Sequence, residues 1–173
     1  RYGYGNMRDY ALEDDKCAIE QLAARHSFMD ITKVGIFGHS GGGFMAAAAL
    51  CKYPDFYTAA VASAGNHDNR VYNRGWVEIY HGVKEKSRKV KTAGGQDSIV
   101  YDYSCKIPTN MELAGNLKGH LLLVAGDQDA NVHPAHLMRF ADALIKAGKN
   151  FDMVLLPGAK HGYTCLLYTS DAA

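Results

Sequence analysis

A serine stands between glycines where an apolar run gives way to an alanine-rich run. The junction reads Gly38-His39-Ser40-Gly41-Gly42, which has the form G-x-S-x-G. Between a strand and a helix, this pattern predicts a nucleophile elbow that exposes the serine hydroxyl at the carboxyl edge of a sheet. We expect glycine at Gly38 and Gly42 because so sharp a turn leaves no room for side chains there. Ser40 is therefore a candidate nucleophile, and free N–H groups at the start of the next helix could stabilise an oxyanion.

A serine nucleophile needs a base and an orienting carboxylate, and both residue types follow in the order Ser, Asp, His. The apolar run 118–125 predicts a buried strand, which ends in a loop containing Asp127 and Asp129. A second apolar run, 151–156, ends in a loop that contains His161. In this arrangement the serine attacks an acyl carbon, His161 takes and returns the proton, and the carboxylate orients the imidazole. Spacing alone does not choose between Asp127 and Asp129.

The elements that must position these residues alternate between helix and strand. Before the two strands named above, we expect a helix over 10–28, a strand over 33–37, a helix over 42–52, a strand over 59–63 and a helical segment over 69–81. Residues 83–108 are polar and predict an irregular loop or a small hairpin, and a helix is expected over 134–148. This order predicts an α/β fold with a mainly parallel sheet flanked by helices.

The composition indicates one globular unit. The chain has 173 residues, 47% of them hydrophobic, which suffices for one core and not for two. Nineteen basic and eighteen acidic residues leave a net charge of +1, and we interpret the basic run 84–91 as a solvated face. No apolar run approaches the roughly 20 residues that span a bilayer. We therefore predict neither a nucleic-acid partner nor a membrane segment in this stretch.

The functions of the other histidines are less clearly indicated by the sequence. His133 and His136 form an H-x-x-H pair, but no third ligand accompanies them, so we predict no metal site. We interpret His39 as a packing residue inside the elbow. His67 and Asp68 either tune the expected pocket or form an exposed loop pair, and the sequence leaves both options open. The proposed chemistry requires no cofactor.

Three stretches together resemble the catalytic domain of the prolyl oligopeptidase family of serine peptidases, and most of all its bacterial dipeptidyl peptidase IV-like members. They are G-H-S-G-G-G at 38–43, G-D-Q-D-A-N-V-H-P at 126–134 and H-G-Y at 161–163. In the family pattern the acid lies two residues before the Asn of N-V-H, which favours Asp129. The resemblance therefore implies a triad of Ser40, Asp129 and His161. It also implies one oxyanion donor at the N–H of Gly41 and a second, a tyrosine hydroxyl, upstream of this stretch.

Residues 65–76 also resemble these members, and this likeness implies a substrate site. Tyr72 and Trp76 would line the pocket for the residue before the scissile bond, and Val132 would close one side. Asn131 would hold the carbonyl group one residue further back. Flat aromatic walls suit a proline-like ring, which implies release of Xaa-Pro or Xaa-Ala dipeptides from peptide substrates. In the family a β-propeller domain supplies carboxylates for the substrate amine, so we expect a propeller upstream.

The resemblance implies further expectations about the whole protein. The chain would be the C-terminal portion of an α/β-hydrolase fold, residues 1–164, with the N-terminal strands missing. Codons for residues 165–173 can be written to resemble a transposase-end adapter used in shotgun library preparation, so we predict a non-native tail there. The family also implies a periplasmic or secreted location and allows a homodimer.

Three functions remain open. The first is a serine peptidase that releases N-terminal dipeptides. The second is an α/β-hydrolase esterase or acylaminoacyl peptidase with the same triad. The third is an inactive fragment, because one oxyanion donor would be missing from the chain as it stands.

Overall fold

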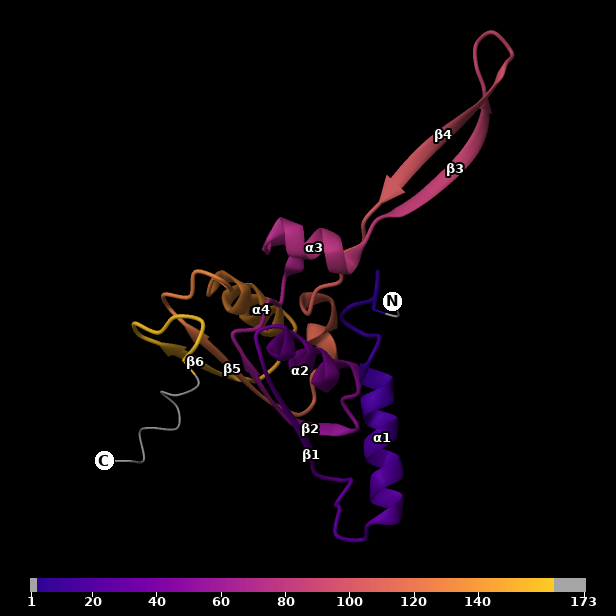
Figure 1. The fold of residues 1–173 in the computed structure, drawn as a ribbon. Helices are drawn as coiled ribbons and strands as arrows, with labels where there is room; N and C mark the ends of the chain where they lie inside the picture. Colours follow the sequence, from indigo (N-terminus) through magenta and orange to yellow (C-terminus); the bar gives the residue numbers. More distant parts are fainter. Residues whose placement is uncertain (1–2, 164–173) are drawn as a thin grey trace.

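The computed structural model describes residues 3–163, and at its centre lies a four-stranded sheet in the order β1-β2-β5-β6. Its strands are β1 (Val34–His39), β2 (Tyr57–Ser63), β5 (His120–Gly126) and β6 (Asp152–Leu156). Every neighbouring pair is parallel, so the carboxyl ends of all the strands meet at one edge (Figure 1). The predicted α/β class with a mainly parallel sheet is confirmed.

The helices alternate with these strands largely as expected. They are α1 (Leu12–Arg25), α2 (Gly41–Lys52), α3 (Arg74–His81) and α4 (Ala135–Lys146), with short 3₁₀ segments η1 (Asn69–Val71) and η2 (Met111–Asn116). Helix α1 is shorter than the predicted 10–28 because the backbone turns extended at His26, whose N–H caps the carbonyls of Leu22 and Ala23. Segment η2 was not predicted, since its six residues are too few to show a helical period.

Helices α2 and α4 cover one face of the sheet. Helix α2 packs on β1 and β2, and α4 packs on β5 and η2. Residues 43–51 of α2 are buried except for Met45, because the helix lies between the sheet and its other neighbours. Leu121, Leu123 and Phe140 belong to the resulting core. This layer holds the start of α2 firmly against the carboxyl edge.

A smaller cluster lies where β5 ends. Ala64, Val124, Ala159 and Tyr163 are all buried and pack together. Tyr163 and Ala159 belong to the segment after β6, so the cluster fixes that loop against β5. The predicted tail at 165–173 lies outside the described residues.

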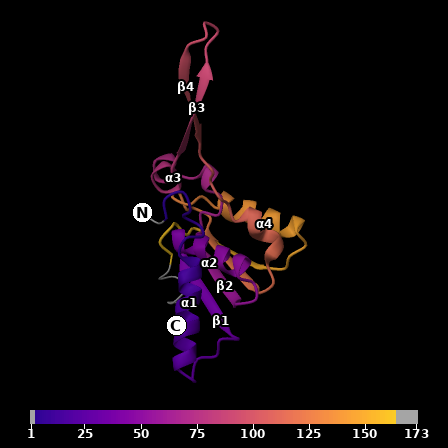
Figure 2. The ribbon, with the colours of Figure 1, turned by 90° about the vertical axis from the view of Figure 1, so that its right-hand side faces the viewer.

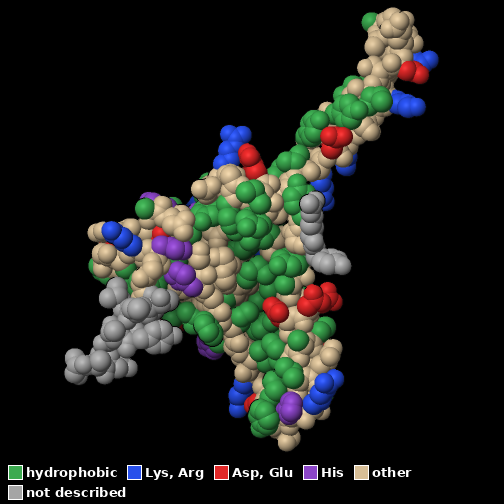
Figure 3. Space-filling view, in the orientation of Figure 1, with side chains coloured by type: hydrophobic (Ala, Val, Ile, Leu, Met, Phe, Trp, Pro, Cys, Tyr) green, Lys and Arg blue, Asp and Glu red, His purple; other side chains and the backbone are tan. Residues whose placement is uncertain are grey.

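Strands β3 (Lys84–Lys91) and β4 (Asp97–Ser104) form an antiparallel hairpin that projects from the body beyond α3 (Figures 1 and 2). The sequence predicted either an irregular loop or a small hairpin here, and the structure shows a hairpin with two eight-residue strands. Its basic side chains are exposed along the arm, as predicted for the run 84–91 (Figure 3). The strands gave a weak signal because solvent reaches both faces of this ribbon, so no face needed to be apolar.

The turn between β1 and α2 is crowded at two glycines. A Cβ on Gly38 would lie 2.2 Å from the carbonyl oxygen of Gly42, and one on Gly43 would lie 2.4 Å from that of Ser63. At Gly42 a Cβ would meet nothing within 4 Å. The expectation that Gly42 is required for lack of space is therefore wrong. Within α2 the crowded glycine is Gly43, because that residue faces β2.

This difference can be measured by substitution. Gly43→Ala should lower the free energy of unfolding by about 1–3 kcal/mol, because the new methyl group overlaps the backbone of β2. Gly42→Ala, its neighbour in the same turn of α2, should leave stability unchanged or raise it by up to about 1 kcal/mol. Urea unfolding followed by circular dichroism compares the two variants. Equal losses in both would contradict the assigned packing.

His67 and Asp68 form no exposed loop pair, so that option is wrong: both residues are buried. The His67 ring packs on Phe140 at a centroid distance of 4.8 Å, and its Nδ1 pairs with Nδ2 of Asn110 at 2.9 Å. Because the Asn110 amide donates, Nδ1 accepts and the ring is neutral. Burial, with a smaller contribution from His136, lowers the pKa of His67 to about 3.

The buried neutral imidazole predicts a pH dependence of stability. Between pH 6.5 and about 3, the unfolded chain binds a proton at His67 that the folded chain does not. The contribution of His67 to the free energy of unfolding should therefore be fully present above pH 6.5 and fall by roughly 1.4 kcal/mol per pH unit below it. Urea unfolding between pH 7.5 and 4.5 measures this slope. His67→Gln should flatten the slope by about that amount, and an unchanged slope would show that His67 is accessible to protons.

Candidate active site

Ser40 lies at the junction of β1 and α2 with φ 58° and ψ −123°, a conformation that non-glycine residues rarely adopt. Its N–H donates to the carbonyl oxygen of Ser63 at the end of β2, over 2.8 Å. Its own carbonyl accepts from the N–H of Phe44 at 3.0 Å, which begins the hydrogen bonding of α2. These contacts hold the strained turn, and the turn presents the serine hydroxyl at the carboxyl edge.

The Ser40 hydroxyl, His161 and Asp129 form one connected chain of hydrogen bonds. Oγ of Ser40 lies 3.0 Å from Nε2 of His161, and Nδ1 of His161 lies 2.7 Å from Oδ2 of Asp129. Asp129 is buried, and its Oδ1 accepts the N–H groups of Asn131 and Val132, each at 2.9 Å. Since the carboxylate can only accept, Nδ1 of His161 carries the proton. Nε2 then has a free lone pair and can accept the proton of the serine hydroxyl.

Asp127 occupies a different place. It is exposed, and its Oδ1 accepts the N–H of Gly158 at 2.7 Å in the turn that follows β6. It therefore supports the loop that carries His161 without contacting the imidazole. Of the two carboxylates that the spacing left open, the structure brings Asp129 to His161.

Gly41 is the first residue of α2. The first N–H groups of a helix have no acceptor within the helix, and the positive end of the helix dipole lies there. The N–H of Gly41, directly after the candidate nucleophile, is thus available to an anion that develops on a carbonyl attacked by Ser40.

A cleft opens beside Gly41. It has a volume of about 680 Å³ and is lined largely by apolar side chains, among them Tyr4, Met45 and Tyr80. The substrate residues predicted from the resemblance do not line it. Sequence reasoning missed these cleft residues because they come from three separate segments that carry no common motif.

The four predicted substrate residues lie around the loop after Asp129. The hydroxyl of Tyr72 donates to Oδ1 of Asn131 at 3.0 Å, and the Tyr72 and Trp76 rings meet edge to face at 5.3 Å. Val132, which follows Asn131 in the sequence, is buried. Trp76 also contacts Tyr80 at a ring distance of 5.0 Å. A row of aromatic rings on and before α3 therefore connects Asn131 to the cleft.

His39 packs on the His161 ring at a centroid distance of 4.8 Å, as its predicted packing role requires. It also belongs to a polar chain: its Nδ1 lies 2.9 Å from Oγ of Ser63, which lies 2.8 Å from the hydroxyl of Tyr163. That hydroxyl donates to the carbonyl of Val124 at 3.1 Å. Burial, followed by the neighbouring His161, lowers the pKa of His39. A neutral His39 thus supports the back of the His161 ring, and Tyr163 in the H-G-Y stretch was the signal for this network.

His133 and His136 each use Nδ1 to accept a backbone N–H. Nδ1 of His133 accepts the N–H of Ala135 at 3.1 Å, and Nδ1 of His136 accepts the N–H of Asp68 at 3.3 Å. Within residues 3–163, no group of three or more His, Cys, Asp or Glu side chains is arranged to hold a metal ion. No helix in the same residues is long and apolar enough to cross a membrane.

The two carboxylates offer a matched test of the hydrogen-bond chain. In Asp129→Asn, the two backbone N–H groups would hold Oδ1, so the amide NH₂ would face Nδ1 of His161. The imidazole would then be forced into the tautomer with the proton on Nε2, which cannot accept the proton of Ser40. Labelling of Ser40 by a small fluorophosphonate, followed by mass spectrometry, should slow by about 10³–10⁴-fold. Asp127→Asn can still accept from Gly158 and should label nearly as fast as wild type; comparable losses in both variants would contradict the assignment.

Known proteins resemble this chain over almost its whole length. The sequence model of the prolyl oligopeptidase family matches residues 1–166. Human dipeptidyl peptidase 8 is 30% identical over 155 residues, which cover 90% of this chain and 16% of that protein. A mouse protein named inactive dipeptidyl peptidase 10 is 24% identical over 143 residues, which cover 83% of this chain and 16% of its own length.

A solved structure shows the same architecture. The crystal structure of Porphyromonas gingivalis dipeptidyl peptidase 4 superposes with a TM-score of 0.75 and 27% identity, covering 98% of this chain and 23% of that one. The chain therefore spans less than a quarter of each of these proteins. The likeness confirms the expected portion of an α/β-hydrolase fold. Because the family match runs through residues 1–166, the chain belongs to the prolyl oligopeptidase family.

Proposed function

We propose that this chain carries the catalytic centre of a serine peptidase that uses Ser40, His161 and Asp129. Oγ of Ser40 attacks the peptide carbonyl while Nε2 of His161 takes its proton. The N–H of Gly41 donates to the oxyanion that forms. His161 then protonates the leaving amine, and a water molecule activated by the same imidazole hydrolyses the acyl-enzyme.

The observation that carries this proposal is the continuous chain from the Ser40 hydroxyl through His161 to the buried Asp129. Family membership alone would not suffice, because one relative is named an inactive dipeptidyl peptidase. The distances of 3.0 and 2.7 Å lie in the range that proton transfer and orientation require.

For the substrate, we propose the release of N-terminal dipeptides of the Xaa-Pro or Xaa-Ala type. The edge-to-face pair of Tyr72 and Trp76 provides an aromatic corner, and the Tyr72 hydroxyl contacts Asn131. Two of the relatives above are named dipeptidyl peptidases, which supports the same substrate class. An upstream β-propeller, a homodimer and a periplasmic or secreted location remain predictions from the resemblance.

A second candidate is an esterase or acylaminoacyl peptidase with the same triad. The apolar cleft beside Gly41 favours it, because a cleft of about 680 Å³ could receive an acyl chain next to the oxyanion donor. The two candidates differ in what they require of the substrate: a dipeptidyl peptidase recognises a free amine, and an esterase does not.

Hydrolysis assays separate these candidates. The protein expressed from the complete reading frame around this chain should cleave glycyl-prolyl p-nitroanilide and should cleave its N-acetyl form at least about 100-fold more slowly, since a lost charged hydrogen bond or ion pair costs several kcal/mol. Ser40→Ala should abolish both activities. Rapid cleavage of p-nitrophenyl butyrate with none of the dipeptide amide would favour the esterase and overturn the dipeptidyl proposal. The 173-residue chain alone should be slower by about 10²–10³-fold if the second oxyanion donor lies elsewhere, as the family pattern implies.

A further inference from the structure

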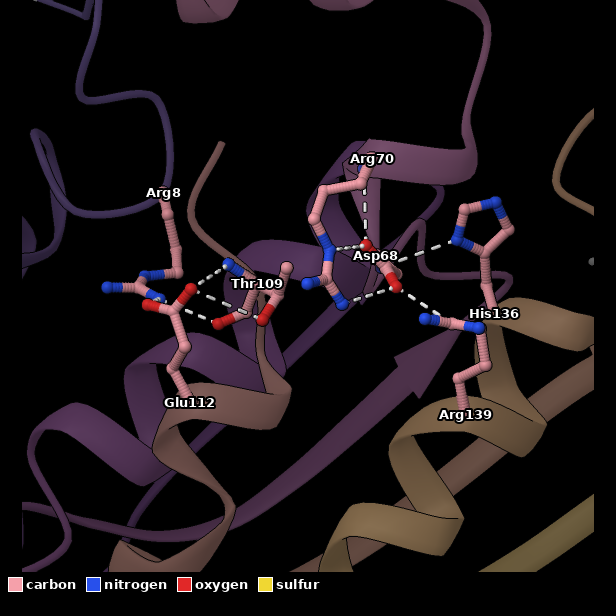
Figure 4. A network of polar contacts seen from close by, with 7 residues as sticks. All are labelled: Arg8, Asp68, Arg70, Thr109, Glu112, His136 and Arg139. Atoms are coloured by element: carbon pink, nitrogen blue, oxygen red, sulfur yellow. Dashed lines mark hydrogen bonds and ion pairs between the residues drawn. The ribbon is translucent and has the colours of Figure 1, made fainter. Parts of the chain in front are cut away.

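Asp68 holds a buried negative charge between two arginines (Figure 4). Its side chain is 0% exposed, whereas the Arg70 and Arg139 side chains are about half exposed. Arg70 binds both carboxylate oxygens, with Nε at 2.8 Å and Nη2 at 2.9 Å, and Nε of Arg139 binds Oδ2 at 2.7 Å. These guanidinium hydrogen bonds outweigh burial and keep the pKa of Asp68 below its usual range. The carboxylate is therefore charged at neutral pH.

The two arginines come from different elements. Arg70 lies in η1, which Asp68 caps at its N-terminus and which leads directly to Tyr72. Arg139 lies in α4, whose preceding loop contains Asn131 and Val132. Asp68 thus joins the segment that leads to Tyr72, one wall of the proposed substrate site, to helix α4, which follows the loop that contains Asn131, the other wall.

Two further contacts close the connection into a ring. The backbone N–H of Asp68 donates to Nδ1 of His136, one turn before Arg139 on α4, and the His136 ring meets Tyr72 edge to face at 5.7 Å. At the other end, the hydroxyl of Tyr72 donates to Asn131. Tyr72 is therefore held by His136 of α4 through ring packing and by Asn131 through a hydrogen bond.

We propose that Asp68 is a positioning residue for substrate recognition, which fixes α4 against the segment bearing Tyr72 and so sets how the Tyr72 and Asn131 side chains are placed in the site. This inference rests on the proposed function, because it takes those two residues as walls of a peptide site. Asp68 acts through them and touches no reacting atom: none of its hydrogen bonds within the described residues reaches Ser40, His161 or Asp129.

These contacts predict that substitutions at Asp68 or its partners change peptide affinity without changing the reactivity of Ser40. Asp68→Asn removes the charge at constant size. Arg139→Gln removes the side-chain link to α4 from a half-exposed position and leaves the bond of the Asp68 N–H to His136, so this variant should fold even if the first does not. Lys146→Gln is the matched control, because Lys146 also lies on α4 and pairs with an exposed carboxylate, Asp142, at 2.8 Å.

Two readouts are needed, both in the protein expressed from the complete reading frame. Binding of the tripeptide Gly-Pro-Gly is measured by calorimetry in proteins that also carry Ser40→Ala, so that no turnover occurs. The Kd should rise about tenfold in Asp68→Asn and about fivefold in Arg139→Gln, since small displacements of positioning groups have large effects. The double variant should bind no more weakly than Asp68→Asn, because Arg139 acts through Asp68. Lys146→Gln should bind as wild type.

Fluorophosphonate labelling of Ser40, in proteins that retain the serine, is the second readout. It should stay within about threefold of wild type in the Asp68 and Arg139 variants. The inference is overturned if the tripeptide does not bind, if Arg139→Gln changes its Kd no more than Lys146→Gln, or if labelling slows in parallel with binding, which would mark a structural role. Failure of wild-type Ser40 to label, with tripeptide binding still dependent on Asp68, would overturn the proposed reaction and leave the positioning role supported.

Discussion

The close approach of the β1–α2 turn to β2 determines the geometry of the carboxyl edge. Ser40 occupies a φ of 58°, which costs about 1–3 kcal/mol and persists only where neighbours hold it. Here the hold comes from the bond of its N–H to Ser63 and from the contact of Gly43 with the same carbonyl. Ala64, the next residue, has a φ of 46° and bonds in turn to Val124 of β5. Strain is therefore concentrated on adjacent strands, where it aims the serine hydroxyl toward the loops after β5 and β6.

The two carboxylate oxygens of Asp129 bind different partners, and this fixes the orientation of His161. Oδ1 of Asp129 is occupied by two backbone N–H groups, so only Oδ2 faces His161. A buried carboxylate with fewer donors would be costly and free to rotate. With its partners fixed, Asp129 can impose one tautomer on the imidazole, and His39 supports the ring from behind. The base is thus oriented by backbone geometry rather than by the flexible ends of side chains.

Much of this could be predicted from sequence because it depends on local patterns. The elbow at Ser40 follows from glycine spacing, and the order of strands and helices follows from apolar runs. The choice of Asp129 over Asp127 did not follow from spacing, because both stand in one loop. The family resemblance favoured Asp129, and the hydrogen bonds of the loop show how the two carboxylates differ. The burial of Asp68 was equally beyond reach: its partner Arg139 lies on a helix far along the chain, and an acidic residue in a polar segment normally predicts exposure. The cleft beside Gly41 required the packing of distant segments.

The proposed catalytic and recognition parts of the site depend on different elements but share one loop. His161 belongs to the segment after β6, and the Asp68 contacts belong to η1 and α4. Asn131 and Val132 belong to both parts, because their N–H groups hold Asp129 while the Asn131 side chain accepts from Tyr72. A peptide that displaced Asn131 would therefore also disturb the carboxylate that orients the base. In the proposed mechanism, a substrate that moves the backbone of this loop is therefore penalised in the chemical step as well as in binding. A change confined to the side-chain contact between Tyr72 and Asn131 leaves those N–H groups on Asp129 and affects binding alone.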